Sequence, residues 1–440
     1  MRGQGAGRPA VTRAAAEARR EPPSPLMVLA VVLTVIAGLG EWKVVNSALG
    51  ALPKAVSLGV PALAAAAFLV RPDMTRMRRC RLVLPVYLLY IAVLLMWSLG
   101  VWMHDLTQTA SIVRGVSKLL YQCAAILFAV GFVYLCGERA ADALFAAMAL
   151  TNALIALLEL PGYGLMQSVR SVIDGIVSYG NAAGYMRALE IHDVTFLFGQ
   201  FFVYYAALAP RGDARRRRGC RVRAAAAMAF MLLGLKRTAI PAALLWSVLA
   251  AFLLRRRRPV CWIVALGAAM IVLFWVYLAA IRSGLLFALT DRLGIDTMGR
   301  AYLWQLAEPY YSLSPAFAGQ GFEAVDAIVS GWYHDGLLTH AYPFHNDILK
   351  VYVELGFFGF LLWAAVLYLV HPLALSRALG ERAAVTFFCL LGYMSVTYLT
   401  DNTAFYYWSC IGLRLIPLAA GLRPDGEGGA HEKGQTAQGA

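Results

Sequence analysis

Charged residues are scarce in this sequence. Aspartate, glutamate, lysine and arginine make up 15% of its 440 residues, whereas hydrophobic residues make up 60%. This composition excludes a soluble enzyme. Apolar runs of about 17 to 23 residues recur along the chain, and such runs are long enough to cross a bilayer. The sequence therefore predicts an all-α polytopic membrane protein.

Patterns typical of disulfide-rich and metal-binding proteins are also missing. None of the seven cysteines lies in the two long loops predicted to face outward, and the sequence has no Cys-x-x-Cys pair. A disulfide framework and a zinc site are therefore not expected. An Asp-x-Asp metal-binding motif is absent as well. We expect the cysteines to fill helix interfaces as small apolar residues.

Acidic residues are outnumbered by basic ones, 25 to 39, which gives a formal net charge of +14. The basic runs fall between apolar segments and do not form one patch, so they indicate membrane topology and not nucleic-acid binding. If the spans alternate, six arginine groups fall on one side, which the positive-inside rule assigns to the cytoplasm together with both termini. These groups lie at 13–20, 71–81, 139, 211–223, 255–258 and 377–382, whereas the short turn at Lys236 and Arg237 faces outward. About twelve spans are expected, at approximate positions 26–40, 47–70, 82–102, 116–136, 141–160, 194–209, 224–235, 238–254, 259–280, 348–370, 384–400 and 404–421.

Composition divides the chain into a membrane domain and two tails. Residues 1–25 are rich in Ala, Gly, Arg and Pro without apolar periodicity, which predicts a disordered cytoplasmic arm. Residues 26–422 are expected to form the membrane domain, and residues 423–440 a disordered cytoplasmic tail. Two sizeable extracytoplasmic loops are expected at about 161–192 and 282–345.

The apolar segment that begins near residue 348 carries titratable residues at places that are unfavourable in lipid. A histidine stands at its mouth, and a glutamate lies about two helical turns inside. The stretch combines His-Asn, Leu, Glu-x-Gly and a further Gly at fixed spacings: His345, Asn346, Leu349, Glu354, Gly356 and Gly359. It resembles the signature of the O-antigen ligase and O-antigen (polysaccharide) polymerase superfamily. The resemblance extends over roughly residues 225–420.

The resemblance implies that the membrane domain is a GT-C-like glycosyltransferase acting outside the bacterial cytoplasmic (inner) membrane. In the family, the functional residues are an Arg at an interrupted helix, an Arg in the large loop upstream of a Trp, and the His of the His-Asn pair. The matching positions here are Arg237, Arg300 and His345. Gly319 and Gly321 match a Gly-x-Gly turn of the family's large loop.

The reaction implied by the resemblance is an inverting, metal-independent transfer of a glycan from undecaprenyl diphosphate, without a cofactor. Arg237, Arg300 and the adjacent Lys236 would bind the diphosphate, since guanidinium groups grip phosphate oxygens bidentately and keep their charge. They would stabilise the charge that develops on the leaving group. His345 would be the general base, because the free pKa of histidine is near neutral.

The helix that follows His345 is expected to assist it. Asn346 or Asp347 would cap the helix, and the positive helix end would favour a neutral imidazole. Gly356 and Gly359 are expected to allow close helix contact.

The second substrate is expected to lie near the end of the first outer loop. Arg187, His192 and Asp193 are candidates to contact it. Asp401 and Asn402, in the last outer turn, are similar candidates.

Each candidate also has an ordinary structural interpretation. His345 could be an ordinary interfacial histidine, Arg237 an arginine that snorkels to lipid headgroups, and Arg300 a member of an ion pair within its loop. The motif favours the functional interpretation over the structural one for each of the three. Glu354 lies four residues after Lys350, so a helical ion pair is available. We expect Glu354 to have a supporting role.

Two branches of the family remain open. A polymerase joins repeat units of O-antigen or exopolysaccharide, whereas a ligase moves the finished glycan to lipid A-core or another acceptor. Lys236 stands where many ligases have Ser, and the ending Thr400-Asp401-Asn402 looks more like polymerases. These two features favour a polymerase, with a flippase and a chain-length regulator as the partners implied by the resemblance.

A polysaccharide flippase or another secondary transporter fits twelve spans equally well. A transporter should place charged residues at mid-membrane and often shows inverted repeats. The sequence shows no internal repeat, and the candidate cations lie at one predicted face. Transport is therefore the more distant alternative.

Overall fold

The computed structural model describes residues 23–50, 52–104, 109–177, 184–210, 214–234, 236, 238–295, 297, 299–340 and 342–422. The predicted disorder of residues 1–22 and 423–440, and the predicted site residue Arg237, lie outside the described residues. All regular secondary structure in the described part is helical. The predicted all-α class is therefore confirmed.

Helices occupy every region in which an apolar span was predicted. Their bounds are α2 Pro25–Leu39, α3 Lys43–Leu49, α4 Leu52–Val56, α5 Gly59–Val70, α6 Met74–His104, α7 Thr109–Cys136, α8 Ala140–Tyr163, α9 Leu165–Val177, α10 Gly184–Ala188, α11 His192–Val203, α12 Ala214–Leu233, α13 Ala239–Leu253, α14 Pro259–Arg282, α15 Leu285–Arg292, α16 Arg300–Leu306, α17 Ala324–His334, α18 Asp347–Ala365, α19 His371–Leu379, α20 Glu381–Tyr398 and α21 Tyr407–Leu422. Short 3-10 or π turns lie between some of them: η1 Gly137–Arg139, η2 Tyr204–Leu208, η3 Glu308–Tyr310, η4 Val366–Val370 and η5 Thr403–Phe405.

Several helices are long and apolar enough to cross a membrane. A bent pair, α2 and α3, which meet at 88°, adds one more if it forms a single broken span. Helices α13 and α21 and the segment from Asp193 to Leu208 are apolar but shorter. Among the described residues, five helical stretches meet the length and hydropathy of a span: Leu52–Val70, Met74–His104, Ser111–Tyr163, Pro259–Arg282 and Asp347–Leu379. These stretches confirm a polytopic membrane protein, and the count of twelve stays a prediction.

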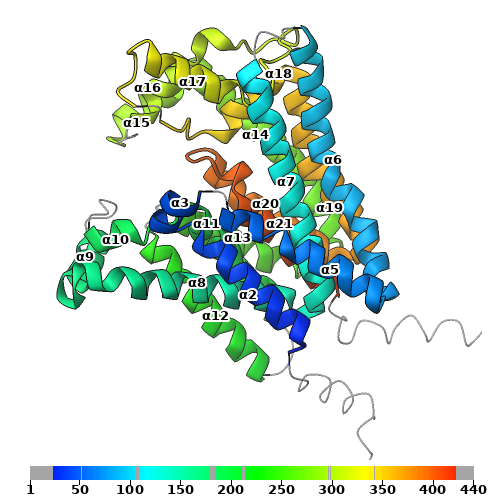
Figure 1. Cartoon of the computed structure of the whole chain (residues 1–440). Helices are drawn as coiled ribbons and strands as arrows, with labels where there is room; N and C mark the ends of the chain where they lie inside the picture. The colour runs from blue at the N-terminus through cyan, green and yellow to red at the C-terminus, as the bar shows by residue number, and fades with distance from the viewer. Residues whose placement is uncertain are drawn as a thin grey trace, which may run out of the picture.

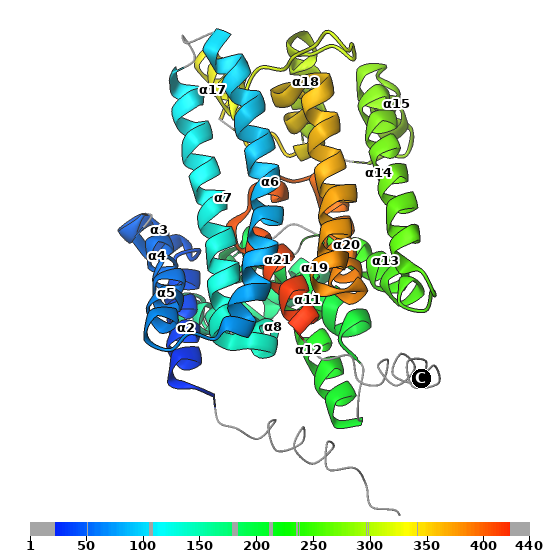
Figure 2. The same cartoon turned by 90° about the vertical axis from the view of Figure 1, so that its right-hand side faces the viewer.

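The helices form an upright group with a second group packed against its lower part. Figures 1 and 2 show α6, α7, α14 and α18 as upright helices, and in Figure 1 α8 runs sideways away from the lower end of α7. Helices α15 to α17, from the large loop, lie at the upper end. Helix α21 packs against α7, α11 and α20, and nearly all residues of α20 and α21 are buried. These two C-terminal helices therefore form the centre of the core.

Helix α18 is broken at Gly356, and the large loop docks into the break. Gly356 has a left-handed backbone, φ 68° and ψ −169°, inside the helix. The N–H of Gly321 donates to the Glu354 carbonyl (2.9 Å), and the N–H of Phe357 donates to the Phe317 carbonyl (2.9 Å). A Cβ on Gly356 would lie 2.3 Å from the Phe317 oxygen, and one on Gly319 would lie 2.5 Å from the Glu354 oxygen. Only glycine fits either position.

This geometry refines what was expected of the motif glycines. Gly359 does allow close contact between helices, because a Cβ there would lie 2.7 Å from Nε1 of Trp97 on α6. The backbone that Gly356 admits belongs to the large loop and not to a helix. The Glu-x-Gly and Gly-x-Gly motifs are therefore two halves of one contact.

Candidate functional site

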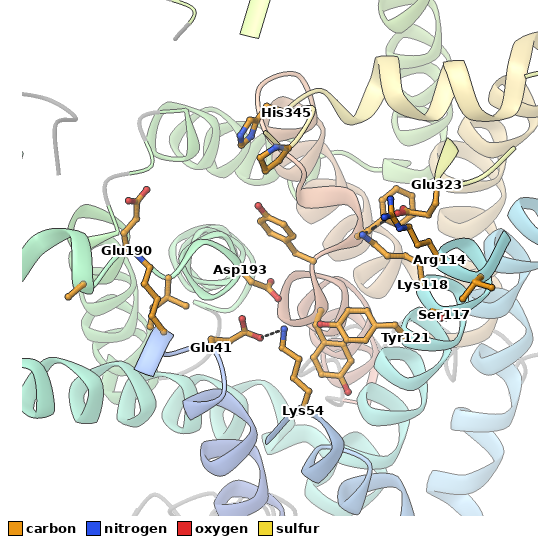
Figure 3. Close-up of a pocket in the computed structure, with 18 residues that line it drawn as sticks. Glu41, Lys54, Arg114, Ser117, Lys118, Tyr121, Glu190, Asp193, Glu323 and His345 are labelled. Carbon is orange, nitrogen blue, oxygen red and sulfur yellow. Dashed lines mark ion pairs between the residues drawn. The ribbon is translucent and has the colours of Figure 1, made fainter. Parts of the chain in front are cut away.

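A cavity of about 770 Å³ lies beside the start of α18. It is lined by residues of α3, α4, α7, α10 and α11, by the loops that precede α17 and α18, and by the turn that leads into α21 (Figure 3). Both long outer loops of the sequence contribute to it. The alternating topology predicted from the basic residues places all of these segments at or near its outer face.

His345 lines this cavity in an unusual backbone conformation. Its φ is 53°, a region that non-glycine residues rarely adopt. The backbone N–H of His345 donates to Oδ1 of Asn402 (2.8 Å), and Nδ1 of its ring lies 3.4 Å from Oδ1 of Asp401. The side chain is 20% exposed. The last outer turn thus holds both the backbone and the ring of His345.

Asp401 is a buried carboxylate that remains ionised. Its Oδ1 also accepts from the hydroxyl of Tyr406 (3.3 Å), and its Oδ2 lies 4.0 Å from Nζ of Lys236. Burial alone would raise the pKa of Asp401, but the His345 ring and the Lys236 charge hold that pKa below its usual range. A carboxylate at Nδ1 favours the tautomer with the proton on Nδ1. Nε2 of His345 is then free to accept a proton.

Asn346 is the residue that caps α18. Its Oδ1 accepts from the N–H of Leu349 (3.0 Å), and its Nδ2 donates to the hydroxyl of Tyr277 on α14 (3.0 Å). The neighbouring carboxylate of Asp347 instead accepts from the N–H of Ala404 (2.7 Å). The first turn of α18 is thereby tied to α14 and to the last outer turn.

Lys236 is paired with carboxylates in this site. Its Nζ lies 3.0 Å from Oε1 of Glu190, in addition to its contact with Asp401. Sequence reasoning assigned Lys236 to the diphosphate together with Arg237, which lies outside the described residues. In the structure, Lys236 connects the first outer loop to the carboxylate that faces His345.

Arg300 is the first residue of α16 and is half-buried. It does not line the cavity. Its helix is nevertheless anchored beside the site, because Nε1 of Trp304 donates to the carbonyl of Phe344 (3.1 Å). Helix α16 is thus held next to Phe344, the residue before His345, but the side chain of Arg300 is not among those that line the cavity.

The three candidates from the first outer loop are placed differently. Arg187 is exposed on α10 and is not among the lining residues, whereas Asp193 lines the cavity. The two carboxylate oxygens of Asp193 accept from the N–H groups of Trp408 (2.8 Å) and Ser409 (2.9 Å). Asp193 therefore holds the first turn of α21. The side chain of His192 lies outside the described part of the chain.

Sequence reasoning missed four cations that line the cavity: Lys43, Lys54, Arg114 and Lys118. Lys54 pairs with Glu41 (3.2 Å) and Lys118 with Glu323 (3.7 Å). The available signal was the four-residue spacing of Arg114 and Lys118 at the outer start of a predicted span. That spacing places both residues on one face of a helix.

A buried ionic cluster lies next to the cavity. Nζ of Lys350 lies 3.1 Å from Glu323, 3.0 Å from Asp326 and 3.8 Å from Glu354. The helical pair expected from the four-residue spacing of Lys350 and Glu354 is thus present, within a larger cluster. Burial raises the pKa of Glu323. Burial also acts to raise the pKa of Asp326, but the charges of Lys350 and Lys118 and the hydrogen bonds with Glu323 and Lys350 together lower it. The cluster joins α17 to α18 and, through Glu323, to Lys118 on α7.

Comparison with known protein families identifies the segment that contains His345. The family model described as O-Antigen ligase matches residues 224–364. This range begins in α12 and ends at the close of α18, so it includes Lys236, Arg300 and His345 but not α7. A search of the curated proteins found no match.

Proposed function

We propose that this chain, which belongs to the O-antigen ligase superfamily through residues 224–364, polymerises repeat units of a surface polysaccharide. The family as a whole acts by glycosyl transfer from lipid-linked glycans. The finer proposal is an inverting transfer from an undecaprenyl-diphosphate-linked glycan at the outer face of the bacterial cytoplasmic membrane. Both termini then lie in the cytoplasm.

The observation that carries the proposal is the pairing of His345 with Asp401 at the wall of the cavity. Nε2 of His345 takes the proton from the acceptor hydroxyl, while Asp401 stabilises the imidazolium that forms. The acceptor oxygen forms a bond to the anomeric carbon from the side opposite the diphosphate. The bond from that carbon to the diphosphate oxygen breaks, and its electron pair leaves with the diphosphate.

The leaving group needs cations on the other side of the sugar. Arg237 and Arg300 are proposed to bind the departing diphosphate, because two guanidinium groups stabilise the charge that develops there. Helix α16 is anchored beside His345 through Trp304 and Phe344, which keeps Arg300 within the same region of the protein.

The polymerase branch is supported by what surrounds the base. Lys236 contacts Asp401, and Asn402 holds the backbone of His345. These are the residues at which the sequence departs from many ligases and looks more like polymerases. Transfer of a finished glycan to lipid A-core or another acceptor is the alternative within the family.

A complementation experiment tests this function. The deletion strain of the native host would receive the wild type, His345→Ala, or the control His334→Ala, which changes an exposed histidine of α17 outside the cavity lining. Surface glycans and carrier-linked intermediates would be separated by gel at equal protein level. We expect rescue by the wild type and the control, and accumulation of a single carrier-linked repeat unit with His345→Ala.

The other outcomes have definite meanings. Long carrier-linked chains that never reach their acceptor would identify a ligase. Normal glycan from His345→Ala would remove the proposed base, and the His345–Asp401 pair would then only hold the helix in place.

A further inference from the structure

We infer that the face of α7 with Arg114 and Lys118 is a second phosphate-binding subsite, which receives a phosphate group of the acceptor substrate. The inference rests on the proposed glycosyl transfer and adds a chemical class for its second substrate. It is drawn from residues outside the segment that the family model matches.

The first step is the placement of the α7 face. Arg114, Ser117, Lys118 and Tyr121 recur at helical spacing, and all line the cavity that His345 also lines. Figure 3 shows Arg114 and Lys118 entering the cavity from α7, whereas Glu190 enters from the opposite side of the view. Since Glu190 pairs with Lys236, the cations on α7 are separate from the cation beside Asp401.

The second step is the charge balance of these cations. Arg114 is exposed, and in the part of the chain that the structure describes it has no ion pair. Lys54, by contrast, is paired with Glu41. A guanidinium on the wall of a cavity without a carboxylate partner is suited to bind a phosphate group bidentately.

The third step is the way Lys118 is held. Nζ of Lys118 lies 3.7 Å from Oε1 of Glu323 and 5.9 Å from the centre of the Phe405 ring. The same oxygen of Glu323 lies 3.1 Å from Nζ of Lys350. Glu323 is therefore shared between the cavity and α18, and it acts as a positioning residue for Lys118.

The backbone supports this role for Glu323. Among the described residues other than glycine, two have positive φ: Glu323 at 66° and His345 at 53°. Both line the cavity. Backbone strain of this kind persists where the surrounding structure requires it and is concentrated at functional sites. His345 directly precedes α18, and Glu323 contacts both Lys350 of α18 and Lys118 of α7. The proposed base and the α7 cations are therefore held at a fixed distance from each other through α18.

The fourth step concerns which substrate the subsite serves. The cations proposed for the leaving diphosphate, Arg237 and Arg300, belong to the segment matched by the family model, and α7 does not. Two phosphate-bearing substrates bound in one cavity repel each other unless each has its own cations. We therefore assign Arg114 and Lys118 to the acceptor. The phosphate comes either from the diphosphate of a second carrier-linked glycan or from a phosphorylated sugar of a lipid-anchored core.

The experiment counts bound diphosphate lipids. Purified full-length protein in detergent would be titrated with undecaprenyl diphosphate, and the number of lipids bound per chain would be measured by native mass spectrometry and calorimetry. Undecaprenol and phosphatidylglycerol would serve as the probes without a diphosphate. The variants are Arg114→Ala, Arg114→Lys and Arg114→Ala with Lys118→Ala. Arg292→Ala, an exposed arginine of α15 outside the cavity lining, is the matched control.

We expect two undecaprenyl diphosphates per wild-type chain and one per double variant. Loss of a charge-assisted contact weakens binding by about 10- to 100-fold, so Arg114→Ala alone should weaken one of the two sites by that factor. The Arg114→Lys variant should restore part of the lost affinity, and Arg292→Ala should leave both sites unchanged. Because Arg114 is exposed, its single variants provide the test even if the double variant does not fold.

A single wild-type site that the α7 variants do not weaken would overturn the inference. Displacement of the second lipid by phosphatidylglycerol at equal concentration would also overturn it, because the face would then bind ordinary lipid headgroups. In the deletion strain, the double variant should accumulate single carrier-linked repeat units if the acceptor is itself carrier-linked. If the acceptor is a phosphorylated core, it should accumulate long chains that are still linked to the carrier and have not been transferred to the core. Loss of one site in vitro together with normal glycan from His345→Ala would retain the subsite and reject the proposed function.

Discussion

His345 and Lys350 lie five residues apart at the start of α18, and both face carboxylates. His345 has one carboxylate, that of Asp401, 3.4 Å from its ring, and its side chain is 20% exposed. Lys350 has three carboxylates within 4 Å, and its side chain is 5% exposed. The first pair lies open to the cavity, and the second cluster is closed.

This difference in exposure distinguishes a pair that can take part in the reaction from a cluster that stabilises the fold. A base must exchange its proton with a substrate, so one nitrogen of its ring has to remain accessible. A buried cation among carboxylates contributes a fixed geometry, because removal of one member leaves uncompensated charge. The closed cluster therefore holds α7, α17 and α18 together, while the open pair carries the proposed reaction.

The largest effect is expected from Lys350→Met, which removes the cation that lies within 4 Å of all three carboxylates of the closed cluster. Loss of one partner from a buried ion pair costs about 3–5 kcal/mol, so the amount of folded protein in the membrane should fall sharply. Fluorescence-detected size exclusion and thermal unfolding would measure it. The control is Arg170→Ala, which breaks the exposed pair with Asp174 (3.6 Å) and should change little. Equal behaviour of the two variants would mean that the cluster is not a framework.

Gly356→Ala should have the next largest effect, since it disturbs the contact between α18 and the large loop. A backbone with positive φ and extended ψ, here 68° and −169°, costs a residue with a Cβ about 1–3 kcal/mol, and the added Cβ would also meet the Phe317 oxygen at 2.3 Å. Gly336→Ala is the matched control, because Gly336 also has a positive φ, 76°, but no atom within 4 Å of an added Cβ. Thermal unfolding should show a clearly larger loss for Gly356→Ala. A loss no larger than that of Gly336→Ala would show that the loop backbone can move away.

The pair formed by His345 and Asp401 also shows what could be predicted from the sequence. The helix positions follow from long apolar runs, and His345 from a local motif at the mouth of one of them. Asp401 was named only as a candidate for the second substrate, because nothing in the sequence indicates that a residue 56 positions later contacts the His345 ring.

There are also physical reasons why the sequence did not reveal some residues of the site and suggested the wrong place for another. Arg114 and Lys118 were missed because two cations in the first turns of a membrane helix are ordinary at a lipid–water boundary. Arg300 was expected in the site, but its side chain depends on how a long loop folds back, which periodicity does not determine. The helix break at Gly356 was unpredicted because its partner backbone is more than thirty residues earlier.

Asp401→Asn addresses the open pair, with a smaller effect on stability and a direct effect on activity. Without the carboxylate, the imidazolium that forms during transfer loses its counter-charge. Loss of a contact to a charged group, worth about 1.5–3 kcal/mol, should lower the rate of glycan transfer by about 10- to 100-fold. Because the pKa of Asp401 is held below its usual range, the carboxylate also contributes stability that is present above the unfolded pKa of about 3.9. That stability is lost as the pH falls through the lower folded value.

The measurement is the transfer rate of purified protein near neutral pH and its unfolding temperature from about pH 2 to about pH 8, a range that includes the pH values below the unfolded pKa of about 3.9. Wild type should lose more stability than Asp401→Asn toward the acid end, and Asp291→Asn, on the exposed face of α15, should behave as wild type. A variant with wild-type transfer would remove Asp401 from the proposed reaction while leaving its contact with Lys236.

The smallest effect is expected from Asn346→Ala, because Asn346 lies between the open pair and the closed cluster and belongs to neither. Loss of a helix cap costs about 1 kcal/mol, and this substitution also removes the bond to Tyr277 (3.0 Å). In Asn346→Ser, the serine hydroxyl can still accept from the N–H of Leu349, but the side chain is too short to reach Tyr277 as well. Because the cap bond is kept, this variant should recover most of the unfolding temperature that Asn346→Ala loses. Transfer should fall only as far as His345 shifts with the first turn of α18. If Asn346→Ala abolished transfer at unchanged stability, Asn346 would have to contact the substrate, and the separation between reaction and framework along α18 would no longer hold.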